Sequence, residues 1–313
     1  MTVLTHTSLE TFKTCRCKYK YRYIDKICPI ERNAALEFGS QMHLVLQHLF
    51  EMIEAQQTFD GAEYDSKESV TSQLCQMIDI ADMEATDRAK LKGLIIGYIK
   101  RWYESDCYEY EVVDVEREFY VKSTANDWNE GYKFDFSGKV DGILKRKSDG
   151  KYFILEHKTA SAINDDFIQQ KEIDSQTMTY AVAIQEVMDI KVSGAIHDIL
   201  KKQQIRIKKG ETEDEFCQRL IDSVDDDNFT RILVEFPECE LSAFKKELIE
   251  AIDDVAYCRN FYRCTGQCIG RFGACEYLPL CRAHGNMQGL EDVYEIRKPF
   301  EEISNETLES GRE

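Results

Sequence analysis

Apolar residues recur at intervals of three and four through the first third of the chain, which is the period of an amphipathic α-helix. The segment Ser8–Ile27 shows this spacing, and Ser8 at its start predicts an N-cap. A second predicted helix carries His43 and has its apolar face at Met42, Leu46, Leu49 and Ile53. Residues 66–104 predict further helix with a polar break at residues 82–86. The first third of the chain is therefore predicted to be helical.

From residue 112 onward the apolar period falls to two, which predicts β-strands. The first strand has its apolar positions at Val113, Val115, Phe119 and Val121. Residues 134–144 and 151–159 predict two more strands, joined by a turn at Ser148-Asp149-Gly150. The pattern is completed by a helix at 174–188, strands at 192–200 and 231–236, and a helix at 241–262. This order predicts an α/β fold in which helices flank a mixed central sheet.

Three ionisable residues lie within the two predicted strands at 134–144 and 151–159. Asp141 lies in Gly-Lys-Val-Asp-Gly, and Glu156 and Lys158 lie in Leu-Glu-His-Lys. Side chains alternate between the faces of a strand, so Glu156 and Lys158 share a face, and Asp141 can reach them from a neighbouring strand. Two carboxylates beside one ammonium can hold Mg2+ or Mn2+, activate a water and neutralise charge at a phosphodiester. The three residues are therefore candidates for metal-dependent phosphodiester hydrolysis.

The alternative interpretation is an ordinary ladder of Glu and Lys on a solvated strand, because charged side chains usually lie at the surface. Two observations favour a site. Ile154 shares the face of Glu156 and Lys158, and the apolar residues around them predict a strand that is buried on both faces. Charged side chains in such a strand require partners.

The chain has 313 residues and a net charge of -18, from 40 basic and 58 acidic residues. Such a balance disfavours nucleic acid, because phosphate contacts need lysine and arginine. The basic residues are clustered, however, at Lys13, Arg16, Lys18, Lys20, Arg22 and Lys26, among Tyr19, Tyr21 and Tyr23, and again at Lys201, Lys202, Arg206, Lys208 and Lys209. A groove of charge and aromatic rings suits single-stranded nucleic acid. A solvated helix face with tyrosines in the core is the alternative.

The apolar fraction of 43% is ordinary for a globular protein with a core. No run approaches the roughly 18 apolar residues that a membrane helix needs. The N-terminus also lacks the basic and apolar regions of an export signal. A cytoplasmic protein without membrane contact is therefore expected.

Twelve cysteines in a chain without an export signal favour metal or cluster binding over disulfides. Five of them crowd into one glycine-containing stretch, at Cys258, Cys264, Cys268, Cys275 and Cys281. Tetrahedral zinc or an iron-sulfur cluster needs four ligands. The last three cysteines are spaced more widely than in a zinc knuckle, so zinc is the weaker interpretation. The fourth ligand is Cys264, or else Cys15 or Cys17, either of which would clamp the two ends of the chain together.

Taken in order, these motifs resemble the PD-(D/E)XK nuclease superfamily. Within it they resemble the RecB-like nucleases that carry an iron-sulfur cluster, which include CRISPR-associated exonucleases and phage-encoded relatives. The matching positions are Cys15 before Lys18-Tyr19-Lys20-Tyr21, Gly39-x3-His43, Asp141, Glu156-His157-Lys158, Gln176-x3-Tyr180, and Cys268, Cys275 and Cys281. The resemblance covers nearly the whole chain. It implies a restriction-endonuclease-like core, an N-terminal helical region and a C-terminal cysteine-rich region that binds the cluster.

The resemblance also implies roles for individual residues. It implies a site for Mg2+ or Mn2+ at His43, Asp141 and Glu156, with Lys158, Gln176 and Tyr180 joining Asp141 and Glu156 in catalysis. It implies a 4Fe-4S cluster on Cys15, Cys268, Cys275 and Cys281, with Cys17 and Cys264 as near neighbours that could substitute. Glu116 and Glu118 compete for a further acidic position and rank below the others. The basic N-terminal cluster provides the candidates for DNA binding, Lys18, Tyr19, Lys20 and Arg22.

One nuclease domain is expected over residues 1–313. Its parts are an N-terminal helix with a cluster ligand at 1–38, a helical region at 39–105, the nuclease core at 106–240, a helix and the cysteine-rich region at 241–290, and an acidic tail at 291–313.

Two hypotheses of function follow. The first is a metal-dependent deoxyribonuclease that acts on single strands or strand ends, alone or with protein partners in recombination, repair or defence. The second is a nucleic-acid-binding or adaptor subunit of such a complex, in which the nuclease fold serves recognition. The acidic composition suits protein contacts and favours the second hypothesis. The intact set of Asp141, Glu156 and Lys158 favours the first.

Overall fold

The computed structural model describes residues 2–31, 34–57, 64–122, 134–270, 273–298, 300, 303 and 307. Most of the predicted acidic tail lies outside these described residues. Contacts divide the chain into two units that are each built from separate segments. Unit 1 contains residues 1–33, 118–139 and 239–313, and unit 2 contains residues 34–117 and 140–238.

Unit 2 is built around a mixed β-sheet. Strand β5 (Tyr152–Ala160) pairs antiparallel with β4 (Phe134–Arg146) and parallel with β6 (Val192–Lys201), which pairs antiparallel with β7 (Phe229–Glu235). Strand β3 (Tyr110–Val121) also pairs with β4, and residues 118–121 of β3 and 134–139 of β4 belong to unit 1. The predicted strands are therefore present, and the predicted α/β fold with a mixed sheet is confirmed.

The turn between β4 and β5 follows the sequence pattern. Gly150 has a φ of +72°, a left-handed conformation that residues with a Cβ rarely adopt. Its N–H donates to the carbonyl of Arg146 at 2.8 Å, which closes the turn. The glycine therefore fixes where β5 begins, and with it the position of Glu156 and Lys158 along the sheet.

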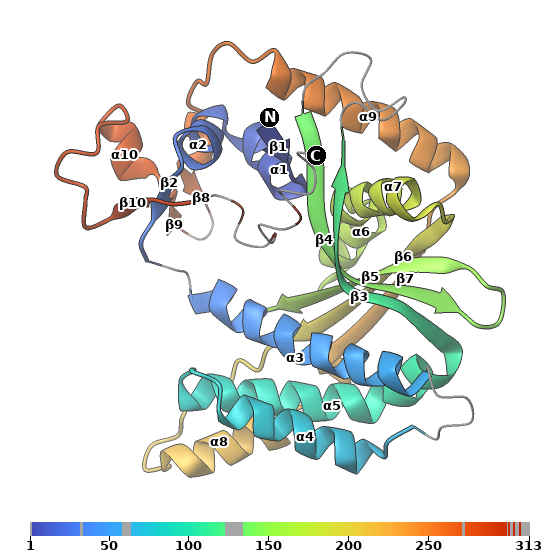
Figure 1. Ribbon diagram of the computed structural model, residues 1–313. Helices are drawn as coiled ribbons and strands as arrows, with labels where there is room; N and C mark the ends of the chain where they lie inside the picture. The colour runs from blue at the N-terminus through green and yellow to red at the C-terminus, as the bar shows by residue number, and fades with distance from the viewer. Residues whose placement is uncertain are drawn as a thin grey trace. The chain divides into compact units, whose positions relative to one another are not determined.

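Helices cover both faces of this sheet (Figure 1). One layer contains α3 (Ala34–Gln57), α4 (Lys67–Asp79), α5 (Ala85–Glu109) and α8 (Glu213–Asp222), and the other contains α6 (Asp165–Glu172) and α7 (Ser175–Met188). A short 3-10 turn, Asp226–Asn228, precedes β7. Leu46, Leu94 and Leu155 belong to one buried apolar cluster that joins α3 and α5 to β5. Burial of this surface is the main stabilising contribution to the unit.

Two features of these helices differ from the sequence prediction. Helix α3 begins at Ala34, ahead of Gly39, because Phe38 extends its buried apolar face toward the N-terminus. Helix α8 was absent from the predicted elements. Its signal is the capping box of Thr212 and Glu215, in which each side chain accepts a hydrogen bond from the backbone N–H of the other residue.

A buried network of charged and polar groups ties β6 and β7 to α5. The Arg231 guanidinium donates to both carboxylate oxygens of Asp198, at 2.6 and 2.7 Å, and to Asp106 at 2.6 Å. The Tyr98 hydroxyl donates to Asp198 at 2.7 Å. Burial disfavours the Asp198 carboxylate, but Arg231 holds the pKa of Asp198 below its ordinary value. The network therefore keeps its charges paired inside the unit.

The N-terminal segment of unit 1 was predicted as one helix over Ser8–Ile27, and this prediction is wrong. Helix α1 (His6–Thr14) has Thr5 as its N-cap, and Ser8 is the third helical residue of the same capping box. The backbone at Cys15 is extended, with φ -158° and ψ 109°, which ends α1. The chain continues as α2 (Arg16–Tyr19) and a π-helical turn, Lys20–Ile24.

The two ends of the chain meet within unit 1. Strand β2 (Ile27–Pro29) pairs antiparallel with β10 (Tyr294–Ile296), and β1 (Thr2–Leu4) pairs parallel with the first residues of β4. The Tyr277 hydroxyl donates to the carbonyl of Ile27 at 2.8 Å. The remaining elements of this unit are α9 (Glu238–Ala256), a 3-10 turn at Thr265–Gln267, β8 (Ile269–Gly270), β9 (Gly273–Ala274) and α10 (Leu278–Arg282).

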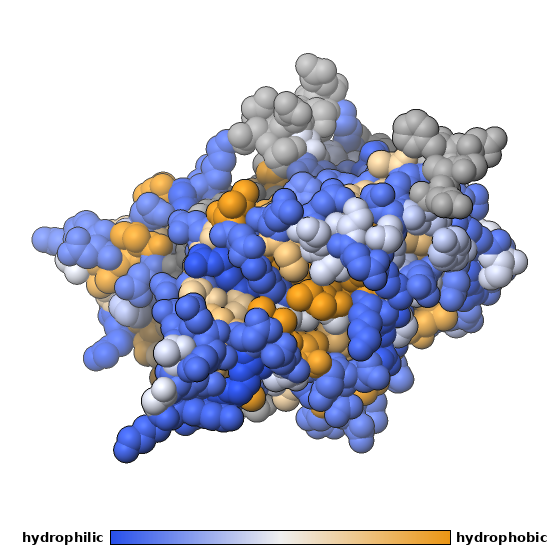
Figure 2. All heavy atoms as spheres, turned by 90° about the horizontal axis from the view of Figure 1, so that it is seen from below, coloured by the Kyte–Doolittle hydropathy of each residue, from blue (hydrophilic) through white to orange (hydrophobic). Residues whose placement is uncertain are grey.

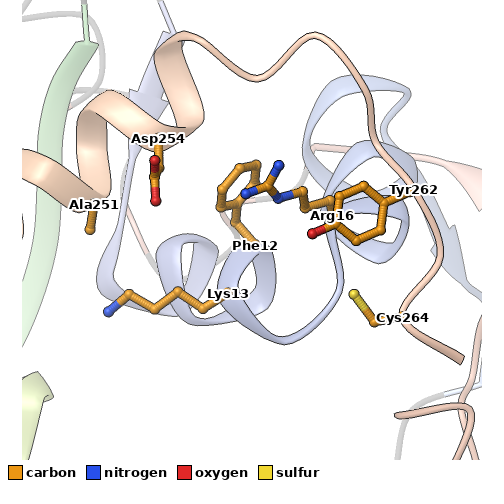
Figure 3. A pocket seen from close by; sticks show the side chains of 7 residues that line it. All are labelled: Phe12, Lys13, Arg16, Ala251, Asp254, Tyr262 and Cys264. Atoms are coloured by element: carbon orange, nitrogen blue, oxygen red, sulfur yellow. The ribbon is translucent and has the colours of Figure 1, made fainter. Parts of the chain in front are cut away.

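Helix α9 ends earlier than predicted. The spacing of apolar residues predicted a helix to residue 262, but its buried positions stop at Val255 and the helix ends at Ala256. The following segment carries Tyr262 to the side of Arg16. The Arg16 guanidinium lies between the rings of Phe12 and Tyr262, 5.0 Å from each ring centre, in a pocket of about 250 Å³ (Figure 3).

The face of the molecule in Figure 2 is covered mostly by hydrophilic side chains, with patches of hydrophobic ones between them. This agrees with a chain in which 31% of residues are charged. Among the described residues, none of the helices combines the length and the apolar character that crossing a bilayer requires.

Candidate active site

Strands β4 and β5 separate at the point where the candidate residues lie. Their backbone pairing runs from Lys145 with Tyr152 to Gly142 with Leu155. One residue further, the Asp141 carboxylate takes the place of a backbone carbonyl and accepts a hydrogen bond from the N–H of His157 at 2.7 Å. The Asp141 side chain is therefore held by the backbone of the strand that carries Glu156 and Lys158.

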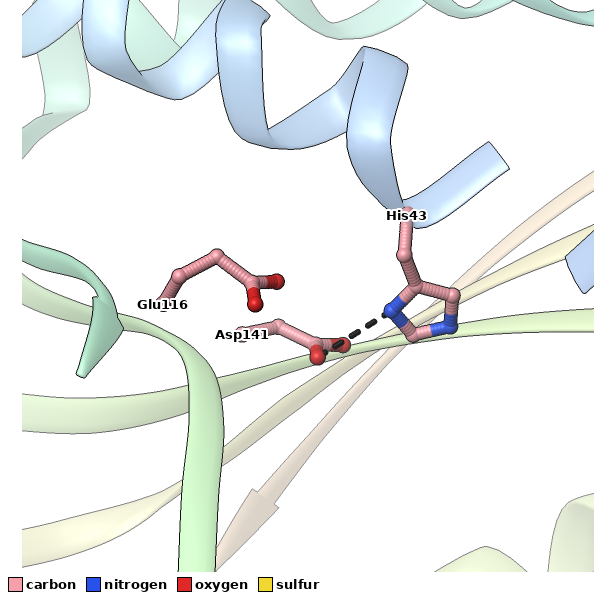
Figure 4. A group of neighbouring side chains, drawn as sticks. All are labelled: His43, Glu116 and Asp141. Carbon is pink, nitrogen blue, oxygen red and sulfur yellow. Dashed lines mark hydrogen bonds and ion pairs between the residues drawn. The ribbon is translucent and has the colours of Figure 1, made fainter. Parts of the chain in front are cut away.

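Helix α3 brings His43 to the other oxygen of Asp141. Met42 and Leu46 are fully buried on the apolar face of α3, whereas the side chain of His43, next to Met42, is 32% exposed. Its Nδ1 lies 3.1 Å from Asp141 Oδ1 (Figure 4). Burial disfavours the imidazolium, but the Asp141 carboxylate holds the pKa of His43 above its ordinary value. Burial likewise opposes ionisation of Asp141, and His43 nevertheless holds the pKa of Asp141 below its ordinary value.

Glu116 of β3 is the third member of this group. Ligand atoms of His43, Glu116 and Asp141 all lie within 4.8 Å of one another (Figure 4). Glu116 has a φ of +50°, a left-handed conformation that is rare for a residue with a side chain. This interrupts the alternation of β3. Two carboxylates and an imidazole at this spacing are a donor set that suits Mg2+ or Mn2+.

The sequence pattern ranks Glu116 below the other acidic candidates and does not separate it from Glu118. Glu118 belongs to unit 1, where its carboxylate accepts a hydrogen bond from the Thr307 hydroxyl. The two residues are two positions apart, so a regular strand would direct both to one face. The signal that separates them is the backbone conformation of Glu116, which a sequence pattern does not reveal.

Glu156 and Lys158 lie in register with β6, where Glu156 is paired with His197. Glu156 is only 3% exposed, whereas the side chain of Lys158 is 42% exposed, and Lys158 Nζ lies 3.7 Å from Glu156 Oε1. Burial, and next the charge of Asp141, raise the pKa of Glu156 to about 8. The site thus holds more carboxylate charge than its own cations offset, which fits the binding of a divalent cation.

Gln176 and Tyr180 face each other on the first turns of α7. Asp174 caps this helix by accepting a hydrogen bond from the N–H of Gln176 at 2.8 Å. The Gln176 side-chain amide donates to the Tyr180 hydroxyl at 3.0 Å. The predicted pair therefore forms a unit on one helical face, on a helix that packs against β5 and β6.

The comparison with known families decides the class of this site. A family profile described as the PD-(D/E)XK nuclease superfamily matches residues 3–282. This chain belongs to the PD-(D/E)XK nuclease superfamily. Membership implies metal-dependent nuclease activity and a nucleic acid substrate. A search of curated proteins gave no significant match.

The predicted DNA-binding residues of this PD-(D/E)XK nuclease lie in unit 1. Lys18 forms an ion pair with Glu276 at 2.9 Å, Lys20 one with Asp25 at 2.5 Å, and Arg22 lies 4.0 Å from Glu276. Tyr19 is 2% exposed, and its ring packs against Phe12, Tyr23 and Phe261. The Tyr19 ring therefore presents no face on which a base could stack, because the core occupies it.

Thiols of the nuclease gather in unit 1, near the paired chain ends. Cys15 and Cys275 pack against a buried apolar cluster that contains Cys17 and Cys281. Cys17 Sγ lies 3.8 Å from Cys281 Sγ. Burial, and next the neighbouring Cys17, raise the pKa of Cys281 to about 12. Cys268 is linked to Cys275 through the backbone, because the Cys268 carbonyl accepts a hydrogen bond from the N–H of Cys275 at 2.8 Å.

Of the four predicted ligands, Cys15, Cys275 and Cys281 lie in or against this cluster, together with Cys17, the alternative N-terminal ligand. Cys264 lies in the wall of the pocket that contains Arg16 (Figure 3).

Proposed function

We propose that this protein is a metal-dependent deoxyribonuclease of the RecB-like type that hydrolyses single-stranded DNA from its ends. The observation that carries the proposal is the bond from the N–H of His157 to Asp141, because it fixes a carboxylate of β4 beside Glu156 and Lys158 of β5. His43 bonds to the other oxygen of the same carboxylate. Such preorganised charge is what phosphodiester hydrolysis requires.

Each residue of the site has a proposed role in hydrolysis. His43, Glu116 and Asp141, whose ligand atoms lie close together, would hold Mg2+ or Mn2+. Glu156 would join them as a further carboxylate, and the imidazole favours Mn2+ as an alternative to Mg2+. When bound, the cation would supply a Lewis acid for the phosphate and lower the pKa of the attacking water. Lys158 would stabilise the negative charge that develops on the phosphate, since its side chain is 42% exposed and can contact substrate. Gln176 and Tyr180 would position the strand from α7.

The proposal includes a 4Fe-4S cluster on Cys15, Cys268, Cys275 and Cys281. Supporting it, thiols from both chain ends pack together in unit 1 beside the β2–β10 pairing. The high pKa of Cys281 shows that its thiolate is unfavourable in this environment without a cation. Bonding to iron would stabilise the thiolate form. The cluster would then hold the chain ends together and would have a structural role.

Lys18, Lys20 and Arg22 would contribute to the approach of DNA through their charge. Each has a carboxylate within 4.0 Å, so its contribution would be a general attraction of the phosphate backbone.

The test is cleavage of end-labelled linear and circular single-stranded DNA and of duplex DNA in Mg2+ or Mn2+, with EDTA as the metal-free control. Glu156→Gln and Lys158→Met should abolish cleavage. Lys145→Met is the matched control, because Lys145 also lies on a strand of the sheet with a side chain 35% exposed. Cleavage of circular DNA would overturn the end-directed part. Undiminished cleavage by the Glu156 and Lys158 variants would overturn the assignment of the site, and an inactive wild-type protein would favour the adaptor function.

A further inference from the structure

A second pocket, of about 340 Å³, lies at the ends of β5 and β6 in unit 2. Lys202 directly follows β6, and its backbone N–H donates to the carbonyl of Ala160, the last residue of β5, at 2.8 Å. Phe38 of α3 and Asp87 of α5 line the pocket as well. Because β5 and β6 are parallel, their C-terminal ends open on the same edge of the sheet.

This pocket shares two elements with the nuclease site. At about 3.3 Å per residue along a strand, Ala160 lies roughly 7 Å beyond Lys158. At 1.5 Å per residue, Phe38 lies about 7.5 Å before His43 along the axis of α3. A Cβ built on Gly39 would lie 3.8 Å from Thr159 Oγ1, so α3 and β5 are in contact between the pocket and the site. A nucleic acid strand advances about 3.4 Å per nucleotide along its axis, so these spacings correspond to one or two nucleotides.

The pocket is basic within an acidic protein. Its cations are Lys90, Lys202 and Arg206, and its carboxylate is Asp87, which forms an ion pair with Lys90 at 2.7 Å. No carboxylate of the described residues forms an ion pair with Lys202 or Arg206. The Lys202 ammonium lies 4.6 Å from the centre of the buried Phe38 ring, which fixes its position.

The wall of the pocket also contains a buried amide. Gln203 is 7% exposed, and its Nε2 donates to the carbonyl of Leu220 at 3.2 Å. Its Oε1 has no hydrogen-bond partner within the described part of the chain. The bond to α8 holds the segment after β6 against the helical layer, so Lys202 and Arg206 are presented from a supported segment.

We propose that this pocket binds a backbone phosphate of the DNA strand, one or two nucleotides from the bond that is cleaved. The inference rests on the proposed nuclease function and adds a subsite to it. Two cations that form no ion pair with the described residues suit a phosphate, which is bound chiefly by Lys and Arg. Continuity with the active site through β5 and α3 favours a phosphodiester over an unrelated anion. The pocket therefore sets the register of the strand and contributes no sequence preference.

Binding of fluorescein-labelled oligothymidylate of about 15 nucleotides tests the inference, in EDTA so that no cleavage occurs. Lys202→Met keeps the aliphatic stem on Phe38 and removes the charge. Lys202→Met and Arg206→Gln should each weaken binding about tenfold and reduce the salt dependence of log K by about 0.7, the value for one phosphate of a single strand. Lys100→Met, an exposed lysine of α5 outside the pocket, should leave both quantities unchanged.

A gain-of-affinity variant guards against loss by misfolding. Asp87→Asn removes the carboxylate of the pocket and should tighten binding several-fold, and circular dichroism melts should match the wild-type protein for all variants.

The outcomes separate the two proposals. Wild-type affinity in Lys202→Met and Arg206→Gln, or no tightening in Asp87→Asn, overturns the subsite whether or not the protein cleaves DNA. Loss of affinity in the two basic variants supports the subsite, and it does so even if the wild-type protein fails to cleave DNA in Mg2+ or Mn2+, which overturns the nuclease function alone.

Discussion

The Asp141 carboxylate accepts a hydrogen bond from the backbone N–H of His157 at 2.7 Å, at the place where β4 and β5 stop pairing. One oxygen of the side chain thus completes the sheet, while the other lies 3.1 Å from His43. Asp141 therefore has a structural role and, in the proposed function, a chemical role, and the two can be separated by substitution.

Asp141→Asn should abolish cleavage and leave the fold intact, because the amide oxygen still accepts the hydrogen bond from His157 but the negative charge is gone. Asp141→Ala should lose activity and also about 1–3 kcal/mol of stability, because the N–H of His157 is left without its partner. Urea unfolding of both variants beside the DNA cleavage assay measures the difference. Equal stability of the two variants would show that the bond to His157 does not support the sheet.

Glu116→Gly should weaken metal binding without lowering the stability of the fold. The left-handed backbone at Glu116, with φ +50°, costs about 1–2 kcal/mol for a residue with a Cβ and little for glycine. The glycine variant should therefore leave the unfolding free energy unchanged or raise it, while the affinity for Mn2+ falls at least tenfold, a change that titration calorimetry can measure. A control, Glu118→Gly, should leave Mn2+ affinity unchanged. Wild-type Mn2+ affinity in Glu116→Gly would remove Glu116 from the site.

Local features of this fold follow from the pattern of residues, whereas features that depend on one backbone conformation or on distant pairing do not. The strands that carry Asp141, Glu156 and Lys158 follow from alternation and from the Gly150 turn, both of which are local. The position of Glu116 beside Asp141 depends on the left-handed backbone of Glu116 itself, and the end of α1 depends on the extended backbone of Cys15. Neither conformation changes the spacing of apolar residues in the sequence. Pairing of β2 with β10 joins segments from opposite ends of the chain, and each strand has three residues, too few to show a period.

The buried Arg231 is expected to be the most sensitive charged residue outside the site. Arg231→Leu would leave Asp198 and Asp106 inside the unit without their shared cation, at a cost of about 3–5 kcal/mol of unfolding free energy. Lys191→Met is the control, because the Lys191–Glu238 ion pair is exposed and its loss should leave the urea midpoint unchanged. If Arg231→Leu has the wild-type midpoint, the network contributes no net stability to unit 2.

Acid sensitivity should arise from buried histidines. His197 is fully buried, and burial lowers its pKa to about 4, below the ordinary value of 6.5. Between pH 6.5 and 4 His197 binds a proton in the unfolded chain but not in the folded chain, so the contribution of His197 to the unfolding free energy falls as the pH falls. At roughly 1.4 kcal/mol per unit of pKa, His197 accounts for a loss of about 3 kcal/mol.

His197→Leu should flatten this part of the pH profile. Both ring nitrogens of His197 lack a hydrogen-bond partner among the described residues, so at pH 8 the variant should be as stable as the wild-type protein or more so. Burial lowers the pKa of His157 to about 4 as well, so part of the acid sensitivity should remain. Urea midpoints measured from pH 8 to pH 4.5 test this. Parallel pH profiles of the variant and the wild-type protein would contradict it.

The cysteines of the N-terminal segment should differ in their effect on iron content. Cys15 is partly exposed at the extended residue between α1 and α2, whereas Cys17 is 5% exposed on α2 within the apolar cluster. A 4Fe-4S cluster needs four ligands, so Cys15→Ser should remove the iron and the visible absorbance of anaerobically purified protein. Cys17→Ala should retain both, because a buried thiol outside the ligand set acts as a small apolar side chain. The opposite result would transfer the ligand role to Cys17, which lies 3.8 Å from Cys281.

Zinc in place of iron in the wild-type protein would overturn the cluster and leave the nuclease site untouched, because His43, Asp141, Glu156 and Lys158 all belong to the other unit.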